Sequence, residues 1–315
     1  MSKIALLVGI DDYQSAPLSG CINDARRIGE LLRRHYDDAP NFDCRVMVSA
    51  DENVTRPKLR EAVETLFSKP ADIALLFFAG HGTANNLGGY LVTQDAAKYD
   101  EGVSMTDVLT FATRSPAREK IIILDCCHSG AFGQFPAIDN KVMLAEGVSV
   151  LTASRDIESA VEANGGGLFT SLVCDALRGG AADVVGKVTV AGIYAYLDEV
   201  LGGWEQRPLF MSHVSKLVTV RNCAPAVPFD VLRKLVCYFP QPDYEYPLDP
   251  SYEPDSEPHN ADHERIFGNL QKMRAARLIE PVGEEHMYYA AMNSKPCRLT
   301  PLGRFYWHRV KSGKI

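Results

Sequence analysis

The sequence lacks a long hydrophobic run. No apolar stretch approaches the ~20 residues that a membrane-spanning helix needs. The first ten residues, MSKIALLVGI, contain no signal-peptide cleavage region, and their short apolar run suits a first buried strand. No internal repeat is visible, so a repeat architecture is not indicated. We therefore expect a protein with no membrane partner.

Metal-binding and disulfide patterns are also missing. The eight cysteines show no CxxC pair and no repeated spacing, so neither a zinc ribbon nor a disulfide framework is indicated. Thiols in such a pattern are typical of a reducing compartment, and we expect a cytoplasmic protein without a required cofactor. An excess of positive charge is also missing: 33 Lys and Arg stand against 40 Asp and Glu, giving a net charge of −7. This balance argues against a dedicated nucleic-acid-binding protein.

What the sequence does contain is an ordinary globular composition, with 46% hydrophobic and 23% charged residues in 315. This length is sufficient for one large domain and a small one. Apolar runs that suit strands alternate with amphipathic stretches that suit helices. The expected strands are near 3–9, 43–49, 72–79, 90–93, 120–124, 148–154 and 208–220, and the expected helices near 25–35, 55–66, 104–116, 168–177 and 190–201. This alternation favours right-handed βαβ units around a mainly parallel sheet.

Two of the apolar runs end in reactive polar residues. Residues 72–82 read DIALLFFAGHG, and residues 120–130 read KIIILDCCHSG. Both runs are typical of strands buried on two faces. Polar residues at the carboxyl ends of parallel strands lie at one edge of the sheet, where open α/β folds place their sites. We therefore expect His81 and Cys127 to lie close together.

A thiol beside an imidazole is the arrangement of a nucleophile and its base. A cysteine needs a nearby base or cation to become a thiolate at neutral pH, and His81 would supply one and later protonate the leaving amine. The N–H groups of Gly82 and Cys127 are candidates for an oxyanion hole. A buried cysteine or a lone histidine is more often structural, and it is the matching strand-end context that favours the catalytic interpretation.

The composition changes after Asn222, which predicts domains at 1–222 and 223–315. We expect a helix at 229–239, an extended, poorly ordered loop rich in proline and acidic residues at 240–260, a helix at 262–278, and a hairpin around 286–292. From His259 onward 10 Lys and Arg stand against 5 Asp and Glu. The order of helices and wing, followed by LTPLG at 299–303, resembles a winged-helix domain.

The larger domain resembles the caspase-like (clan CD, peptidase C14) cysteine peptidases, in the metacaspase and orthocaspase branch. The matching segments occur in family order over residues 3–220: ALLVGIDDY, GCINDA, LLFFAGHG, IILDCCHSG, LTASRDIESAVE, GLFTSLVCDALRG and VTVAGIYAYL. The resemblance implies an α/β/α sandwich with a six-stranded, mostly parallel sheet. It makes Cys127 the nucleophile and His81 the general base, and leaves Cys126 and His128 as packing residues.

The resemblance also implies a substrate preference. Asp24 in GCINDA and Asp125 in LDCCHSG match the acidic pocket positions of metacaspases, and Ser154 is added as a third substrate-binding residue. Two carboxylates facing one guanidinium form a favourable bidentate pair, so we expect cleavage after Arg or Lys and not after Asp. Asp24 also has a structural interpretation, as the cap of a helix over 25–35.

Two further features of the family are weaker here. Lys141 lies in the polar loop after Cys127, where the resemblance implies self-cleavage, although an ordinary exposed lysine explains it equally well. Some metacaspases bind calcium, but no cluster matches theirs, and the only obvious acidic group is Asp95, Asp100 and Glu101.

Three functions therefore compete. The first is an endopeptidase whose C-terminal domain recruits a regulatory protein partner, as in bacterial defence or regulated-death effectors. The second is a regulator that acts mainly through a winged-helix domain bound to a partner or to nucleic acid. The third is an inactive scaffold, against which the presence of both His81 and Cys127 argues. The oligomeric state stays open.

Overall fold

The computed structural model describes residues 2–98, 100–126, 144–153, 162–163, 166–201 and 208–315. Cys127, His128, Lys141 and Ser154 lie outside the described residues. The chain divides into two compact units, Met1–Ala182 with Lys187–Ala224, and Asp183–Gly186 with Pro225–Ile315.

A six-stranded sheet forms the centre of the first unit. Its strand order is β12-β8-β7-β3-β1-β2, and every neighbouring pair is parallel except β12 with β8. The strands are β1 (Lys3–Gly9), β2 (Asp43–Val48), β3 (Ile73–Ala79), β7 (Glu119–Asp125), β8 (Val148–Thr152) and β12 (Leu209–His213). The mostly parallel sheet predicted from the sequence is confirmed.

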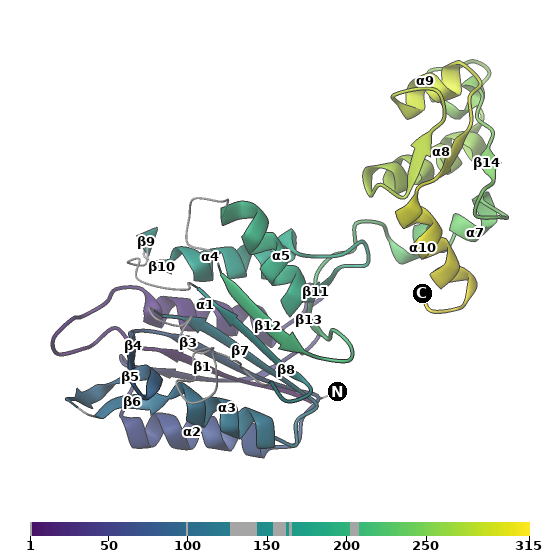
Figure 1. The fold of residues 1–315 in the computed structure, drawn as a ribbon. Coiled ribbons are helices and arrows are strands. Elements are labelled where there is room, and N and C mark those ends of the chain that lie inside the picture. Colours follow the sequence, from purple (N-terminus) through teal and green to yellow (C-terminus); the bar gives the residue numbers. More distant parts are fainter. Residues whose placement is uncertain (1, 99, 127–143, 154–161, 164–165, 202–207) are drawn as a thin grey trace. The chain divides into compact units, whose positions relative to one another are not determined.

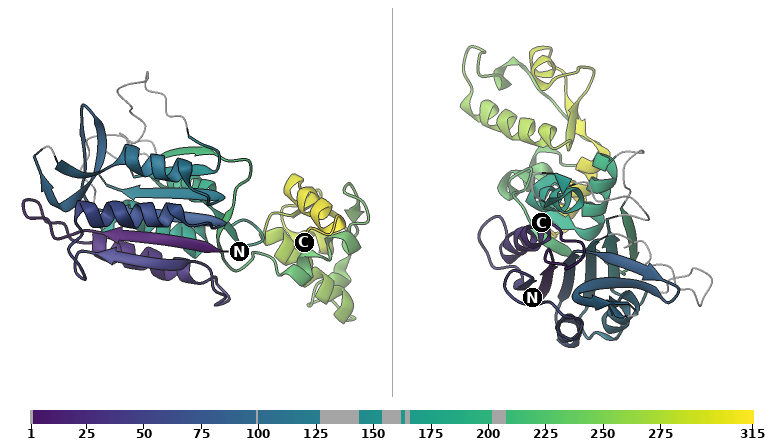
Figure 2. Two further views of the ribbon diagram at one scale, coloured as in Figure 1. Left: turned by 90° about the horizontal axis from the view of Figure 1, so that it is seen from below. Right: turned by 90° about the vertical axis from the view of Figure 1, so that its left-hand side faces the viewer.

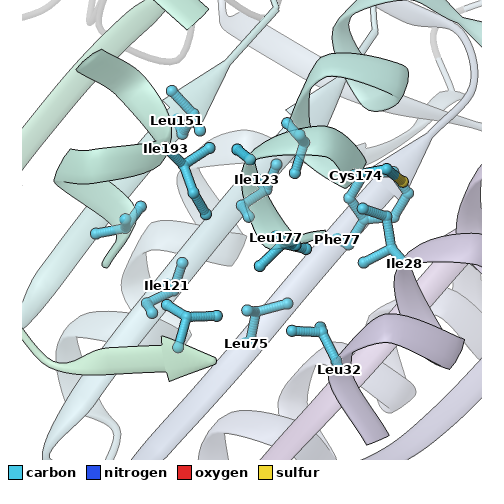
Figure 3. Packing of buried hydrophobic residues seen from close by; sticks show 14 of the residues in the cluster. Ile28, Leu32, Leu75, Phe77, Ile121, Ile123, Leu151, Cys174, Leu177 and Ile193 are labelled. Carbon is cyan, nitrogen blue, oxygen red and sulfur yellow. The ribbon is translucent and has the colours of Figure 1, made fainter. Parts of the chain in front are cut away.

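Helices cover both faces of this sheet (Figure 1 and Figure 2). On one face lie α1 (Cys21–Arg33), α4 (Leu168–Asp175) and α5 (Val190–Leu201), and on the other lie α2 (Arg56–Ser68) and α3 (Met105–Arg114). Successive strand residues point to opposite faces, so Leu75 and Phe77 join the cluster under α1 (Figure 3) while Leu76 and Phe78 join the other. Burial on both faces explains why these strands read as continuous apolar runs.

Short antiparallel sheets and a π-helical turn complete the first unit. One sheet contains β4 (Gly82–Asn85), β5 (Gly88–Ala97) and β6 (Asp100–Ser104), another pairs β11 (Lys187–Thr189) with β13 (Thr219–Asn222), and a third pairs β9 (Glu162–Ala163) with β10 (Gly166–Gly167). A π-helical turn, Ala176–Gly180, follows α4, and Gly179 has a φ of 130° there. β4 begins one residue after His81, so this sheet borders the expected site.

The second unit has its own sheet and core. It contains α6 (Phe229–Leu232), α7 (Leu235–Tyr238), β14 (Glu245–Tyr246), the 3-10 turn η3 (Pro250–Tyr252), α8 (Ala261–Ala275), β15 (Ile279–Pro281), α9 (Met287–Met292), β16 (Cys297–Leu299) and α10 (Pro301–Lys311). The strands pair antiparallel in the order β14-β16-β15. Phe239, Phe267, Leu270 and Trp307 are buried between them and the helices.

One prediction for this unit is wrong and a second is correct only in part. Residues 240–260 are not a poorly ordered loop, because β14 pairs with β16 and the Leu248 and Tyr252 side chains enter the core. The expected hairpin around 286–292 is present as the antiparallel pair of β15 and β16, but the segment between the two strands contains the helix α9. Local composition did not predict the structure of either segment, because contacts with residues distant in the sequence determine it. The winged-helix assignment stays a prediction.

The structure adds one finding about membranes. In the described ranges, no helix combines the length and the apolar character that crossing a bilayer requires.

Candidate active site

The carboxyl ends of β3 and β7 meet at one edge of the sheet. Ala79 pairs with Asp125 in the parallel register, and the N–H of Gly80 donates to the Asp125 carbonyl at 3.3 Å. His81 follows β3 by two residues, and Cys127 follows β7 by two residues. The Cys127 position itself lies outside the described residues.

The His81 ring is held by a backbone carbonyl. Its Nε2 lies 2.7 Å from the carbonyl oxygen of Ala16, in the loop between β1 and α1. A carbonyl can only accept, so Nε2 carries the proton and donates it, and Nδ1 of the neutral ring has a free lone pair. Nδ1 is therefore the nitrogen that can take a proton from a thiol. The sequence could not identify Ala16 as a site residue, because its backbone carbonyl, and not its side chain, contacts the His81 ring.

Gly82, the expected oxyanion donor, starts the edge strand β4. Gly82 lies opposite Leu91 on β5. In the preceding pair of residues, the Val92 N–H donates a hydrogen bond to the His81 carbonyl at 3.0 Å. Hydrogen-bonding residues alternate along an antiparallel pair. The N–H of Gly82 consequently points away from β5.

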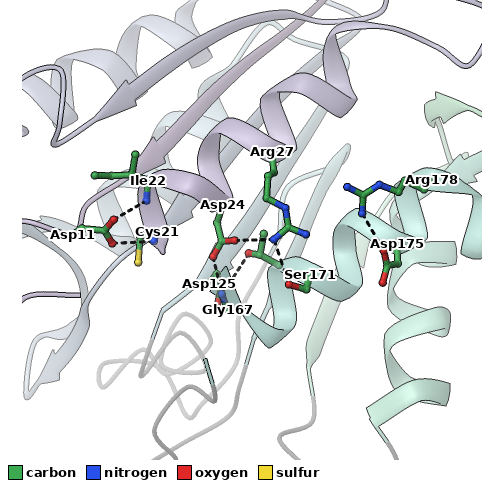
Figure 4. Close-up of polar contacts among 11 residues, drawn as sticks. Asp11, Cys21, Ile22, Asp24, Arg27, Asp125, Gly167, Ser171, Asp175 and Arg178 are labelled. Atoms are coloured by element: carbon green, nitrogen blue, oxygen red, sulfur yellow. Dashed lines mark hydrogen bonds and ion pairs between the residues drawn. The ribbon is translucent and has the colours of Figure 1, made fainter. Parts of the chain in front are cut away.

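Asp24 and Asp125 approach each other around Gly167 (Figure 4). An Asp24 carboxylate oxygen accepts from the Gly167 N–H at 2.9 Å, and an Asp125 oxygen accepts from the Thr170 hydroxyl at 2.5 Å. A Cβ on Gly167 would lie 2.7 Å from Oδ2 of Asp125 and 3.4 Å from Oδ2 of Asp24. The two residues, 101 positions apart in the chain, thus form one acidic site at the start of α4.

The surroundings of this site oppose its ionisation. Burial raises the pKa of Asp24 to about 6, although the Gly167 N–H and, more weakly, the nearby Arg27 lower it. Burial also raises the pKa of Asp125, against the lowering effect of the Thr170 hydroxyl and N–H. Arg27 lies on α1 with Nη1 3.5 Å from Asp24 Oδ1 and 3.4 Å from the Ser171 hydroxyl. A cation that enters beside the two carboxylates would favour their charged forms.

The capping interpretation of Asp24 is wrong. α1 begins at Cys21, so Asp24 lies inside its first turn. The cap comes from Asp11, whose carboxylate accepts from the N–H groups of Cys21 at 2.9 Å and Ile22 at 3.2 Å. Sequence periodicity placed the helix start four residues late because Gly20 and Cys21 carry no capping signal of their own.

The remaining expectations concern packing and calcium. Cys126 is buried, at 6% exposure, in the core under α2 and α3, which fits a packing residue. Asp95 accepts from the Arg56 N–H at the start of α2, and Asp100 pairs with the Arg56 side chain. Within the described part of the chain, no group of three or more His, Cys, Asp and Glu residues could hold a metal ion.

Comparisons with known proteins agree with this architecture. The family model of peptidase C14, the caspase domain, matches residues 2–218. Metacaspase-6 of Arabidopsis thaliana is 30% identical over 146 residues, which are 41% of this chain and 39% of that protein. Metacaspase-3 of Trypanosoma cruzi (strain CL Brener) is 28% identical over 156 residues, 42% of this chain and 41% of that protein. The chain spans about two fifths of the length of these curated relatives.

Solved structures share the fold at low sequence identity. Caspase-1 from Spodoptera frugiperda has a TM-score of 0.50 at 11% identity, over 70% of this chain and 90% of that one. Protein GSU0716 from Geobacter sulfurreducens has a TM-score of 0.51 at 14% identity, over 69% of this chain and 95% of that one. These likenesses confirm the expected caspase-like sandwich. With the family model matching more than two thirds of the sequence, the chain belongs to the caspase-domain family of cysteine peptidases.

Proposed function

We propose that the first unit is a cysteine endopeptidase that cleaves proteins after Arg or Lys, with Cys127 as nucleophile and His81 as general base. The observation that carries this proposal is the convergence of Asp24 and Asp125 on Gly167 at the sheet edge that bears His81. Asp24 is buried and Asp125 half-buried, and of these two described carboxylates Arg27 pairs only with Asp24, at 3.5 Å, so a second cation beside them would be favourable. The side chain of a substrate arginine or lysine is such a cation.

The reaction follows from the groups at this edge. His81 Nδ1 takes the Cys127 proton, and the thiolate attacks the carbonyl carbon of the substrate Arg or Lys to displace the amine of the next residue. The N–H groups of Gly82 and Cys127 stabilise the oxyanion. The imidazolium returns its proton to the leaving amine, and water then hydrolyses the thioester to regenerate the thiol. The Ala16 carbonyl stays bonded to Nε2–H throughout and keeps the ring in one orientation.

The proposed substrate specificity depends on the positive charge of the substrate side chain and on the planar shape of the arginine guanidinium. A guanidinium offers parallel N–H donors to two carboxylates, so we expect Arg to be preferred over Lys. Ser154 would add a polar contact to the substrate, and Lys141, a basic residue in the loop after Cys127, would be the point of self-cleavage. An aspartate side chain would meet repulsion here.

We further propose that the protein acts in the cytoplasm as a defence or regulated-death effector whose second unit recruits a regulatory protein. Support comes from large apolar side chains left exposed on two helices of that unit, Tyr289 at 50% on α9 and Phe305 at 52% on α10. Nucleic acid is the alternative ligand, because six Lys and Arg and no Asp or Glu occur from His286 to the last residue. Binding that weakens steeply with salt would identify nucleic acid.

The test of the main proposal is cleavage of fluorogenic peptides that end in Arg, Lys or Asp, with and without calcium. Wild type should cleave after Arg and Lys, Cys127→Ala should be inactive, and the matched Cys126→Ala should keep its activity. Cleavage after Asp would refute the acidic pocket and leave the nucleophile in place. Full activity in Cys127→Ala would refute the peptidase mechanism.

A further inference from the structure

Tyr13 makes two contacts with His81 and a third with Val92 on the neighbouring strand β5. The Tyr13 hydroxyl accepts from the backbone N–H of His81 at 3.0 Å and donates to the Val92 carbonyl at 3.2 Å. The two rings pack with centroids 4.6 Å apart at an angle of 54°. Tyr13 is only 8% exposed, so these contacts are shielded from water. A single side chain thus bonds to the segment that carries His81 and to the strand beside it.

The residue before His81 leaves room for this hydroxyl. A Cβ on Gly80 would lie 2.5 Å from the Tyr13 oxygen, well inside van der Waals contact. Gly80 is therefore needed at this position for Tyr13 to reach the His81 N–H. The glycine before the histidine and the tyrosine 67 positions earlier are two parts of one arrangement.

The phenol keeps its proton in this position. Burial raises the pKa of Tyr13, and the neighbouring Cys21, Cys126 and Asp11 add to the rise, while the His81 N–H opposes it. A neutral hydroxyl has one proton to donate and lone pairs to accept with. It can therefore serve Val92 and His81 at the same time, which neither phenylalanine nor a phenolate could do.

The loop that carries Tyr13 also carries the carbonyl that bonds the His81 ring. Ala16 lies three residues after Tyr13 and accepts from Nε2 of His81. The loop is closed on itself at its base, where the Asp11 carbonyl accepts from the N–H groups of Tyr13 at 3.0 Å and Leu18 at 2.9 Å. The backbone and the ring of His81 are thus fixed from one closed loop.

We propose that Tyr13 is a positioning residue: it holds the backbone and the ring of His81 where Nε2–H reaches the Ala16 carbonyl, so that Nδ1 stays available as the base. This inference rests on the proposed function for its consequence in catalysis, but the placement of the ring can be measured without turnover. A purely structural tyrosine would support the fold and leave the tautomer and the chemical step unchanged.

The test uses Tyr13→Phe, which keeps the ring and removes the hydroxyl. Tyr252→Phe is the matched control, since Tyr252 is 6% exposed and its hydroxyl bonds the Tyr246 hydroxyl at 2.9 Å in the second unit. We expect Tyr13→Phe to lower kcat on the arginine peptide about 10- to 100-fold while KM changes about twofold or less, because small displacements of a base slow the chemical step. Tyr252→Phe should retain wild-type kcat. In a His81→Ala background, Tyr13→Phe should cause no further loss.

Histidine NMR supplies the readout that does not need activity. With ¹⁵N-labelled histidine in the full-length protein, wild-type His81 should show the Nε2–H tautomer, and Tyr13→Phe should show averaged tautomers. An unchanged tautomer together with wild-type kcat in Tyr13→Phe would overturn the inference. If Cys127→Ala kept full activity, the proposed peptidase mechanism would fail, and the tautomer of Tyr13→Phe would still decide whether Tyr13 positions His81.

Discussion

At the level of single residues, two opposing effects act on the carboxyl groups of the acidic site: desolvation disfavours their ionisation, and nearby hydrogen bonds and charge favour it. Asp24 is 2% exposed, and Asp125 lies within reach of the same glycine. Burial favours the protonated form of each carboxyl group, whereas the proposed recognition of a substrate cation would require the ionised form. Hydrogen bonds from the start of α4 and the nearby Arg27 partly restore ionisation. The site should therefore respond to pH in a range where most surface carboxylates do not.

We predict that kcat/KM for an arginine peptide rises as pH increases through about 6, the pKa of Asp24. The raised pKa means that Asp24 is protonated below this pH, so cation binding fails on the acid side. Arg27→Gln should move this limb to higher pH, because Arg27 lowers the pKa of Asp24, and Arg27→Lys should restore it. The measurement is a pH series of kcat/KM for wild type and the two variants.

The control for this prediction is alkylation of Cys127 by neutral iodoacetamide, followed by mass spectrometry, because that reaction does not use the acidic site. Its pH profile should be the same in wild type and Arg27→Gln. An acid limb that stays near pH 6 in Asp24→Asn would contradict the assignment to Asp24.

Gly167 provides a steric test of the same site. We predict that Gly167→Ala raises KM for arginine peptides and destabilises the fold by about 1–3 kcal/mol, the usual effect of overpacking, because its Cβ would lie 2.7 Å from Asp125 Oδ2. Gly268→Ala is the control: no heavy atom lies within 4 Å of its Cβ. In the middle of α8 it should stabilise by about 0.5–1 kcal/mol. Urea unfolding and peptide kinetics measure both, and wild-type KM in Gly167→Ala would refute the close approach.

At the scale of an element, α1 depends on a residue outside it. Gly20, the residue before the helix, has a φ of 137° and contributes no capping side chain. The carboxylate of Asp11, ten residues before Cys21, satisfies two N–H groups of the first turn. A negative charge at this end also suits the helix dipole. Because Asp24 lies in the first turn of α1, the Asp11 cap also stabilises the position of one of the two carboxylates of the acidic site.

We predict that Asp11→Ala lowers the free energy of unfolding by about 1–2 kcal/mol, as expected for a lost helix cap. Asp11→Asn should lose less, because an amide oxygen still accepts. The neighbouring exposed Asp12→Ala serves as the control and should change stability little. Denaturant unfolding followed by circular dichroism gives these values, and equal stability of the Asp11→Ala and Asp12→Ala proteins would argue against the cap.

At the scale of the whole molecule, the two units have separate hydrophobic cores. The clusters on the two faces of the large sheet belong to the first unit, and a third cluster that includes Phe267 and Leu270 belongs to the second. Trp307 lies in this third cluster, where its indole N–H donates to the Phe239 carbonyl at 2.6 Å. Its fluorescence therefore reports on the second unit.

We predict that Leu270→Ala destabilises the second unit by about 2–5 kcal/mol, the usual range for a fully buried leucine. The measurement is unfolding of Trp204→Phe protein, in which Trp307 is the only tryptophan left. The Trp307 transition should shift to lower denaturant while the loss of peptidase activity keeps its midpoint. A common shift of both transitions would show that the units unfold as one.

The apolar pattern of the sequence was sufficient to predict the mostly parallel central sheet of the first unit, but not the antiparallel sheet of β4, β5 and β6. Continuous apolar strands between amphipathic helices bury their side chains best in a sheet that helices cover on both faces. The parallel register of β3 with β7 then brings the carboxyl ends of these two strands together. The same local patterns failed in the second unit, where short segments such as 286–292 suit either a strand or a helix.

The contacts that hold the site in place depend on the three-dimensional path of the chain and could not be predicted from residue types. The contacts of Asp24 with Gly167, of Asp11 with Cys21, and of His81 with the Ala16 carbonyl join segments 10 to 143 residues apart. Two of them use backbone N–H groups, which every residue except proline has, and one uses a backbone carbonyl, which every residue has. The residue types therefore indicate the candidate reactive groups. The tertiary fold determines which backbone groups contact them and so fix their orientation and charge.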